Sequence, residues 1–381
     1  MVPADLEGWI AGTLIPRWIA RAVVPGRPGY LEYLDAAREP DHRERKTTLV
    51  TARLVYTFSH AHLIRPNEAS LAAARHGMAF LRDLCRGADC RIRHAVREDG
   101  TALDARTDLY DLAFVLFATA WYVRATGERD TLALADEVLA FMDEALAQPN
   151  GGYAEDDAGT LPRRQNPHMH LLEAFHALAE TTGESRWLDR ASAMVRLIED
   201  RLLDRETGSL GEFFDADWAP WLGERGLLRE PGHHFEWVWL LIHHARLTGD
   251  RSVLATADRL YAFGLAHGLA HLPDGLPVVR DGVDRLGRPV ASTGLLWPQT
   301  EAIKAFAARL ETGDEAARPH LDAHLQTLFR HYVDAETGLW HNQLASNGEP
   351  VKAELPIRVL YHLMLAVAEV ARVQRALPQR R

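Results

Sequence analysis

The chain has 381 residues, of which 47% are hydrophobic and 25% are charged, a balance typical of a folded protein with a large core. Its formal net charge of −10 disfavours a nucleic-acid partner, because a polyanion is bound by concentrated basic surface. Two cysteines, Cys85 and Cys90, are too few for a disulfide framework, and no stretch has the pattern of a signal peptide or membrane span. We therefore expect a cytoplasmic protein with no membrane and no nucleic-acid partner.

Helical periodicity dominates the chain. Apolar residues recur at spacings of three and four within 112–122, 171–179 and 238–245, as expected for helices with a buried face. Sustained strand alternation is nearly absent, and the segments 208–214 and 339–343 are short enough to be hairpin arms within loops. The pattern predicts an all-α protein.

A Thr-Gly-acidic tripeptide punctuates the helical segments four times. It begins at Thr126, Thr182, Thr248 and Thr312, and these positions differ by 56, 66 and 64 residues. Such spacings fit two helices with their loops, which indicates stacked helix hairpins. Glycine suits the left-handed residue that ends a helix, so we interpret the tripeptide as a structural repeat.

About six helix pairs fit between residues 30 and 373, and they could form an open solenoid or a closed ring. The long connections 204–231 and 272–296 favour the ring, because loops at one mouth of a ring build a pocket. No linker rich in Pro, Gly or Ser divides the chain. We therefore predict an all-α (α/α)6 barrel of six helix hairpins, with residues 1–381 as a single domain.

Three histidines occur at or near the start of predicted inner helices: His170, His233 and His362. Glu173 and Glu236 follow the first two by three residues, which places acid and imidazole on one helix face. A carboxylate there can set the ring tautomer and raise its basicity. A single histidine among 19 would mean little, but recurrence at matching repeat positions indicates proton-transfer residues.

Clustered histidines also raise the question of a metal. The pairs His267/His271 and His320/His324 have the i,i+4 spacing of helical zinc ligands, but neither includes the Glu of a His-Glu-x-x-His motif. A Gly-rich phosphate loop and a Gly-x-Ser-x-Gly motif are also missing. We expect no metal and no other cofactor.

Aromatic and cationic residues complete the candidate pocket. Trp237, Trp239, Trp297 and Trp340 are candidates for stacking on sugar rings, although a Trp in an apolar helix also suits the core. Arg53 is flanked by apolar residues, where a cation needs a partner or a ligand oxygen. We therefore expect Arg53 to face a pocket.

Six segments resemble the N-acylglucosamine 2-epimerase superfamily in order and spacing. They are Arg53 with Tyr56-Thr-Phe-Ser59, Tyr110-Asp-Leu-Ala-Phe114, Asn166-Pro-His-Met-His-Leu-Leu-Glu173, Pro231-Gly-His-His-Phe-Glu236, Trp297-Pro-Gln-Thr-Glu301 and Tyr361-His362. The resemblance covers roughly residues 30–373 and implies an (α/α)6 barrel that isomerises or epimerises sugars.

The resemblance also implies roles for individual residues. His233 and His362 would be the acid/base pair beside C1 and C2 of the sugar, with His170 as a third pocket histidine. Arg53 would hold the oxygen that becomes an enediolate. The implied substrate-binding set is Arg53, Tyr110, Asn166, Glu173, Glu236, Trp297 and Gln299.

We expect an isomerase that interconverts an unphosphorylated aldose and ketose of the mannose–fructose type, with His362 as base and His233 as acid. The elements around His233 and Trp297 resemble monosaccharide isomerases, and the pocket motifs contain no basic cluster for a phosphate. In cellobiose epimerases a Trp lies shortly before the C-terminal histidine, whereas residues 354–361 here contain none, which argues against a disaccharide. A 2-epimerase of a monosaccharide or N-acylhexosamine is the alternative.

Two other functional classes are alternatives for this sequence. An (α/α)6 glycoside hydrolase would need two carboxylates at the mouth, for example Asp111 and Glu301, and would leave the repeated histidines unexplained. A non-catalytic scaffold would lack a pocket that collects Arg53, His233 and His362. The partner we expect is a small-molecule sugar, and the chain would be a monomer or homodimer.

Overall fold

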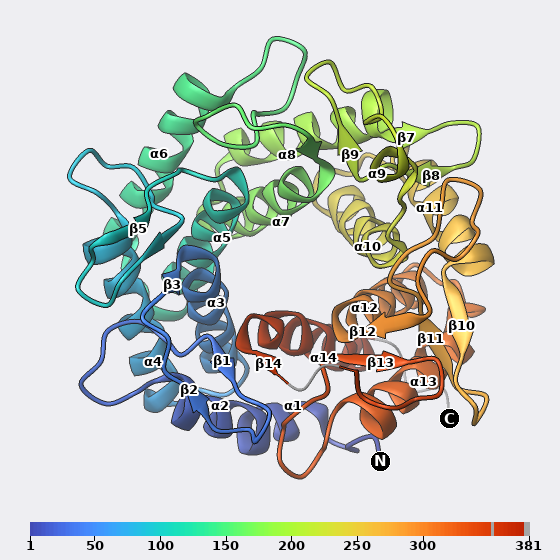
Figure 1. The fold of residues 1–381 in the computed structure, drawn as a ribbon, viewed down its shortest axis with the longest axis horizontal. Coiled ribbons are helices and arrows are strands. Elements are labelled where there is room, and N and C mark those ends of the chain that lie inside the picture. Colours follow the sequence, from blue (N-terminus) through green and yellow to red (C-terminus); the bar gives the residue numbers. More distant parts are fainter. Residues whose placement is uncertain (352–353, 377–381) are drawn as a thin grey trace.

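Six helices form the inner wall of the molecule and surround its axis (Figure 1). They are α3 (Thr48–Ile64), α5 (Leu109–Thr126), α7 (Gln165–Thr182), α10 (Pro231–Thr248), α12 (Leu296–Glu311) and α14 (Leu360–Ala376). Each packs against the next, and α14 packs against α3, so the ring is closed. The computed structural model describes residues 1–351 and 354–376.

A second layer of helices lies outside this ring (Figure 1). It consists of α1 (Leu6–Trp9), α2 (Ile15–Ala22), α4 (Glu68–Phe80), α6 (Leu132–Phe141), α8 (Ser185–Leu197), α11 (Leu254–His267) and α13 (Ala317–Thr327). The (α/α)6 barrel predicted from the sequence is thereby confirmed, and the solenoid is excluded by ring closure.

The two layers differ in sequence because they differ in burial. In α5 every residue from Asp111 to Ala120 is buried, as expected for a helix that is apolar on all faces. In the outer helix α8, by contrast, burial is restricted to one face that includes Trp187, Ala191 and Met194. The core therefore lies between the layers and between neighbouring inner helices.

The N-terminal segment supplies the sixth outer helix, whereas the helix pairs expected from the sequence began near residue 30 and did not include it. Helix α1 packs against the last inner helix, α14, and α2 packs against α4. Trp9 Nε1 donates to Ala335 O (2.7 Å) and Trp18 Nε1 donates to Gly338 O (3.0 Å). The beginning and end of the chain thus close the barrel together.

The Thr-Gly-acidic tripeptides end four of the inner helices. Helices α5, α7 and α10 each end at a left-handed glycine, for example Gly183 with φ of 74°. At these three turns the Thr hydroxyl also accepts a hydrogen bond from the following acidic residue's backbone N–H, as in Thr182 and Glu184 (3.2 Å). Their structural role is confirmed.

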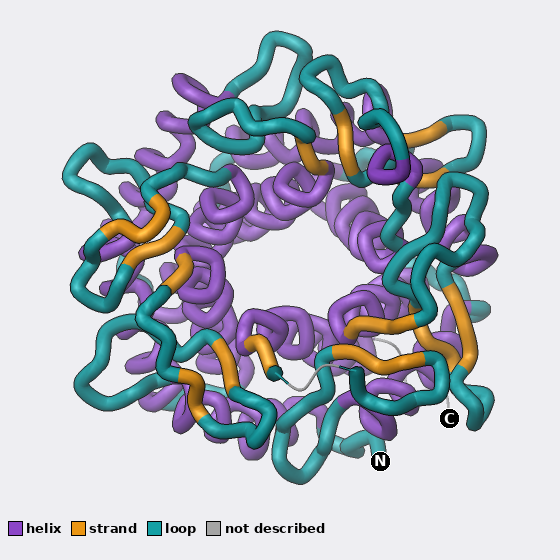
Figure 2. The backbone as a smooth tube through the Cα atoms, viewed as in Figure 1, coloured by secondary structure: helices purple, strands orange, loops and turns teal. Residues whose placement is uncertain are grey.

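Short strands tie neighbouring loops together over one end of the barrel (Figure 2). The strands are β1 (Tyr33–Leu34), β2 (Pro40–Asp41), β3 (Lys46–Thr47), β4 (Ala95–Val96), β5 (Ala102–Asp104), β6 (Arg163–Arg164), β7 (Leu203–Asp204), β8 (Ser209–Leu210), β9 (Phe213–Phe214), β10 (Leu269–His271), β11 (Pro277–Val279), β12 (Thr293–Leu295), β13 (Gln343–Ala345) and β14 (Leu355–Pro356). A four-residue helix, α9 (Glu224–Leu227), interrupts the longest loop.

The segment 208–214 contains a hairpin arm, as expected, but its two strands belong to different sheets. Strand β8 pairs with β7, whereas β9 pairs with β6 from the preceding repeat. Similarly, β13 pairs with β12 across two repeats, and β1 pairs with β14 across the point of ring closure. The strands therefore connect adjacent repeats, which local alternation in sequence cannot reveal.

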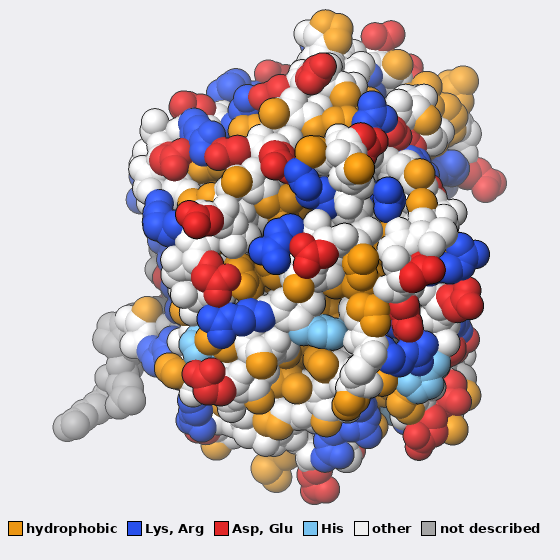
Figure 3. Space-filling view, turned by 90° about the vertical axis from the view of Figure 1, so that its left-hand side faces the viewer, with side chains coloured by type: hydrophobic (Ala, Val, Ile, Leu, Met, Phe, Trp, Pro, Cys, Tyr) orange, Lys and Arg blue, Asp and Glu red, His pale blue; other side chains and the backbone are white. Residues whose placement is uncertain are grey.

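The surface carries charges of both signs. On the face shown in Figure 3, acidic and basic side chains alternate without a continuous patch of either sign. Among the described residues, no helix combines the length and the apolar character needed to cross a bilayer.

Candidate active site

A cavity of about 240 Å³ opens where the inner helices begin. All six inner helices contribute from their first two turns: Arg53 (α3), Tyr110 (α5), Asn166 and His170 (α7), His233 and Glu236 (α10), Trp297 (α12) and His362 (α14). Helix N-termini carry unpaired N–H groups and the positive end of the helix dipole. Their convergence favours a ligand or intermediate that develops negative charge.

His233 is held by two loop carboxylates. Its Nδ1 donates to Glu212 Oε2 (2.9 Å) and lies 3.5 Å from Glu230 Oε2. Burial disfavours the charged imidazole, but attraction by Glu212 and Glu230 outweighs burial and raises the pKa of His233 to about 9. At neutral pH this histidine is therefore a proton donor.

The expected pairing of His233 with Glu236 is wrong. The helical spacing does put Glu236 near the axis, but the His233 ring turns toward the loop that carries Glu212. Glu212 was missed because it lies 21 residues earlier, in a loop that only tertiary structure brings close. Gln165 Nε2 in turn donates to Glu212 (3.0 Å) and fixes its position.

His362 has the opposite protonation preference. Its Nδ1 lies 2.8 Å from Glu301 Oε1, so the ring's other nitrogen, Nε2, is left for the cavity that His362 lines. Burial, together with the positive charges of Arg53 and Lys304, holds the pKa of His362 well below its usual range. At neutral pH this histidine is therefore a proton acceptor.

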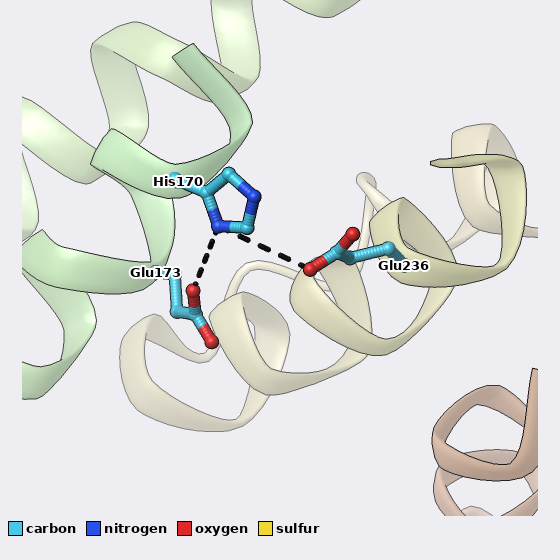
Figure 4. A group of neighbouring side chains, drawn as sticks. All are labelled: His170, Glu173 and Glu236. Atoms are coloured by element: carbon cyan, nitrogen blue, oxygen red, sulfur yellow. Dashed lines mark hydrogen bonds and ion pairs between the residues drawn. The ribbon is translucent and has the colours of Figure 1, made fainter. Parts of the chain in front are cut away.

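The third histidine, His170, lines the cavity and has two carboxyl groups beside its Nδ1 (Figure 4). Its Nδ1 is 3.0 Å from Glu173 Oε2 on the same helix and 4.0 Å from Glu236 Oε1 on α10. The expected His170 and Glu173 pair is confirmed. Burial lowers the pKa of His170 to about 4, so it is neutral at physiological pH. Glu173 also accepts a hydrogen bond from Tyr361 (2.6 Å) and does not line the cavity.

Arg53 is a buried cation in an aromatic enclosure. Its side chain is 4% exposed, and its guanidinium lies over the rings of Phe114 (4.3 Å) and Tyr361 (4.9 Å). Nη2 donates to the Tyr110 hydroxyl (2.7 Å) and Nη1 to Arg358 O (3.5 Å), while Nε has no hydrogen-bond partner among the described residues. Within residues 1–351 and 354–376, no carboxylate forms an ion pair with it. The arrangement leaves the guanidinium available to an anionic ligand oxygen.

Of the four candidate tryptophans, Trp297 lines the cavity. Trp297 lies between the two outer histidines, with ring centroids 4.8 Å from His233 and 5.8 Å from His362. Trp237 and Trp340 are buried in the core, and Trp239 lies below the cavity beside Lys304. The expectation that these three stack on a ligand is corrected accordingly.

The remaining predicted residues divide into lining and supporting positions. Asn166 lines the cavity, and its Oδ1 has no hydrogen-bond partner among the described residues. Gln299 does not line it. Its amide is fully buried, accepts from Val279 N (2.7 Å) and donates to Val279 O (2.9 Å), which anchors β11 to α12. Asn342, in a loop, and Arg358, in the short 3-10 helix Ile357–Val359, also line the cavity and were not expected, because neither belongs to a recognisable motif.

The hydrolase candidates do not meet in the cavity. Asp111 is bonded to His94 (2.6 Å), and Glu301 lies under His362. Neither carboxylate is part of the cavity lining. Two further histidines next to the cavity helices' functional residues accept hydrogen bonds from loop backbone: His168 from Tyr153 N (3.0 Å) and His234 from Leu210 N (2.9 Å).

Three groups of His and Glu side chains in the described part of the chain lie close enough to share a metal ion. They are His170 with Glu173 and Glu236, His233 with Glu212 and Glu230, and His362 with Glu236 and Glu301. Lys304 lies among the first and third groups, with Nζ 2.5 Å from Glu301 Oε2 and 3.7 Å from Glu236 Oε1. The positive charge of Lys304 therefore already lies beside the Glu236 and Glu301 carboxyl groups, where a metal ion would otherwise supply it.

Comparisons with known proteins agree with this geometry. A family model described as N-acylglucosamine 2-epimerase (GlcNAc 2-epimerase) matches residues 29–366. A mannose-6-phosphate isomerase of Rhizobium meliloti (strain 1021) is 33% identical over 376 residues, 96% of each chain. A D-mannose isomerase of Pseudomonas cannabina pv. alisalensis is 29% identical over 342 residues, 83% of this chain and 80% of that one. The solved cellobiose 2-epimerase from Spirochaeta thermophila DSM 6192 superposes with a TM-score of 0.85 at 26% identity, covering 98% of this chain and 96% of that one.

Proposed function

Because the chain belongs to the N-acylglucosamine 2-epimerase family, we propose that it is a metal-free aldose–ketose isomerase acting on an unphosphorylated sugar of the mannose–fructose type. The observation that carries this proposal is the unpaired guanidinium of Arg53 in a cavity lined by one charged and one neutral histidine. An enediolate intermediate is an anion, and a buried, preorganised cation stabilises it without reorganisation.

The proposed proton transfer uses the two histidines in different ways. His233, charged at neutral pH, donates a proton to the ring oxygen as the O1 hydroxyl gives its proton to water, which opens the sugar, and His233 then takes a proton back from water. His362 Nε2 then removes the proton from C2, while Arg53 stabilises the developing negative charge on the oxygen of C1. His362 returns the proton to C1 as the hydroxyl proton moves from O2 to O1. The product is the ketose, with no net gain or loss of protons.

A 2-epimerase is the second candidate, and it uses the same enediolate. Return of the proton to C2 from the opposite face requires a second acid, and His233 lies across Trp297 from His362. A relative named mannose-6-phosphate isomerase at 33% identity and one named D-mannose isomerase at 29% identity both favour the isomerase. The cavity lining also includes Glu230 and Glu236, which suit sugar hydroxyls better than a phosphate.

The test is product analysis by NMR in D2O with mannose, glucose, fructose, lyxose, N-acetylmannosamine, cellobiose and mannose 6-phosphate, each with and without EDTA. We expect mannose and fructose to interconvert, with deuterium at C1 or C2 and rates unaffected by EDTA. Epimer without ketose would establish the second candidate. Turnover of mannose 6-phosphate alone would overturn the unphosphorylated substrate, and loss of activity in EDTA with recovery on adding a divalent ion would overturn the metal-free mechanism.

A further inference from the structure

A lysine lies at the centre of the barrel, directly below the cavity. The chain's 43 lysine and arginine residues include only three lysines: Lys46, Lys304 and Lys352, the last of which lies outside the described residues. Lys304 is fully buried on α12, three residues after Glu301 on the same helix face. A buried ammonium is costly unless it is paired, so its surroundings indicate what it does.

The surroundings of Lys304 are carboxylates from three inner helices. Its Nζ lies 2.5 Å from Glu301 Oε2 and 3.7 Å from Glu236 Oε1, and 4.1 Å from the centre of the Trp239 ring. The carboxylate of Glu173, on α7, also raises the pKa of Lys304 by electrostatic attraction. These three carboxylates are each close to one of the cavity histidines. Lys304 therefore interacts with carboxyl groups that are themselves hydrogen-bonded to, or close to, His362 and His170.

Glu301 links this lysine to the cavity. One carboxylate oxygen faces Lys304 Nζ, and the other lies 2.8 Å from His362 Nδ1. An ionised carboxylate only accepts hydrogen bonds, so Nδ1 must carry the ring proton and Nε2 must be free. A protonated Glu301 could donate to Nδ1 instead and would favour the opposite tautomer.

Ionisation of Glu301 therefore decides which nitrogen of His362 can act as a base. Burial raises the pKa of the Glu301 carboxyl, and the nearest opposing charge is that of Lys304. Neighbouring Glu236, whose pKa is raised to about 8 by burial and by repulsion from Glu301, already carries a proton at neutral pH. Without Lys304, Glu301 would be expected to take up a proton as well.

We propose that Lys304 is a positioning residue of the proton-transfer step: it keeps Glu301 ionised and thereby holds His362 in the tautomer whose Nε2 faces the sugar. This rests on the proposed function insofar as His362 is the base. The arrangement of Lys304, Glu301 and His362 is itself independent of which sugar is bound.

The test combines a spectroscopic readout with kinetics. In protein labelled with ¹⁵N-histidine, the His362 signals are assigned by their loss in His362→Gln. We expect wild-type His362 to be neutral and protonated on Nδ1. In Lys304→Met, a variant of similar length without the charge, we expect that tautomer to be lost and kcat to fall at least about tenfold, with a smaller change in KM.

Lys46→Met is the matched control. Lys46 is also buried, and it pairs with Glu98 (3.3 Å) and donates to Tyr30 O (3.0 Å) away from the cavity. Its replacement should leave the His362 signals and kcat unchanged. If Lys304→Met does not fold, Lys304→Gln, which keeps a hydrogen-bond donor but removes the charge, takes its place.

The outcomes are distinct. An unchanged His362 tautomer in the folded Lys304 variant would overturn the positioning role, as would failure of both Lys304 variants to fold. A changed tautomer in a protein that turns over no sugar in any arm of the D2O experiment would leave the positioning role standing and overturn the proposed function instead.

Discussion

At the scale of single residues, the cavity is organised by the partner of each imidazole Nδ1. His233 faces Glu212, His362 faces Glu301 and His170 faces Glu173. The three pairs look alike, but their surroundings separate them. The pKa of His233 is raised to about 9 by nearby carboxylates, whereas burial and positive charge lower the pKa of His362. One cavity thereby holds an acid and a base at the same pH.

The roles of the two histidines predict that the effects of replacing them on kcat are not additive. His233→Ala and His362→Ala should each lower kcat about a hundredfold or more, and the double variant little further, because either loss disables the shared step. Sugar binding should remain measurable by titration calorimetry. His42→Ala, which removes an exposed histidine outside the cavity, is the control. Near-normal turnover by both single variants would contradict the histidine mechanism.

Arg53→Lys tests the stabilisation of the enediolate. The charge is retained, but the planar donor group over Phe114 is lost, so we expect kcat to fall by roughly 10²-fold with little change in Tm. The control is Arg75→Lys at an exposed surface pair with Glu128. If Arg53→Lys instead unfolds the protein at ordinary temperature, Arg53 has a structural role.

The pH profile of kcat/KM follows from the same groups. Activity requires charged His233, so it should fall as pH rises above about 9. Glu212→Gln removes an attraction that keeps the proton on His233, so the pKa falls and the basic limb moves to lower pH. Glu44→Gln at the surface should leave the profile unchanged. An unshifted basic limb in Glu212→Gln would assign that limb to another group.

At the scale of elements, the two ends of an inner helix differ in what they contribute: the N-terminal end lines the cavity, and the C-terminal end shapes the turn to the next helix. The first two turns carry the cavity residues, and the end of α5, α7 and α10 is a left-handed glycine that turns the chain outward. The strands between repeats hold the loops, and Gln299 anchors one of them to α12. Changes at helix ends should therefore affect stability more than catalysis.

Gly183→Ala tests the helix-end role. An added Cβ meets no atom within 4 Å, but φ of 74° is unfavourable for alanine, so the free energy of unfolding should fall by about 1–2 kcal/mol. Gly12→Ala is the matched control, because it also has open space but no positive φ. Denaturant titration measures both. Equal stabilities would show that conformation at Gly183 is not limiting.

At the scale of the whole molecule, stability depends on closing the ring. The chain's first helices cover its last inner helix, and β1 pairs with β14 beside the cavity loops. Trp18 is fully buried at this junction and stacks on Trp340 with ring centroids 4.4 Å apart. Residues far apart in sequence therefore share one core.

Trp18→Ala should lower the free energy of unfolding by about 3–5 kcal/mol, the usual cost of removing a buried tryptophan. Because Trp18 does not line the cavity, kcat of the folded protein should stay close to that of wild type. Leu222→Ala, at a side chain that is 89% exposed, should change stability by no more than about 0.5 kcal/mol. Unchanged stability in Trp18→Ala would mean that the N-terminal helix is dispensable for ring closure.

The sequence by itself determined the helical repeat, its punctuation by Thr-Gly turns, and the position of Arg53 and the three histidines at helix beginnings. These features follow from local periodicity and spacing, which the chain encodes within one or two helical turns. Only the tertiary structure decided the partners: Glu212 for His233 across 21 residues, Glu301 for His362 across 61, and Glu236 on α10 beside Lys304 on α12. Those contacts arise from closure of the ring, which sets the direction of every inward side chain and has no signature in any short segment.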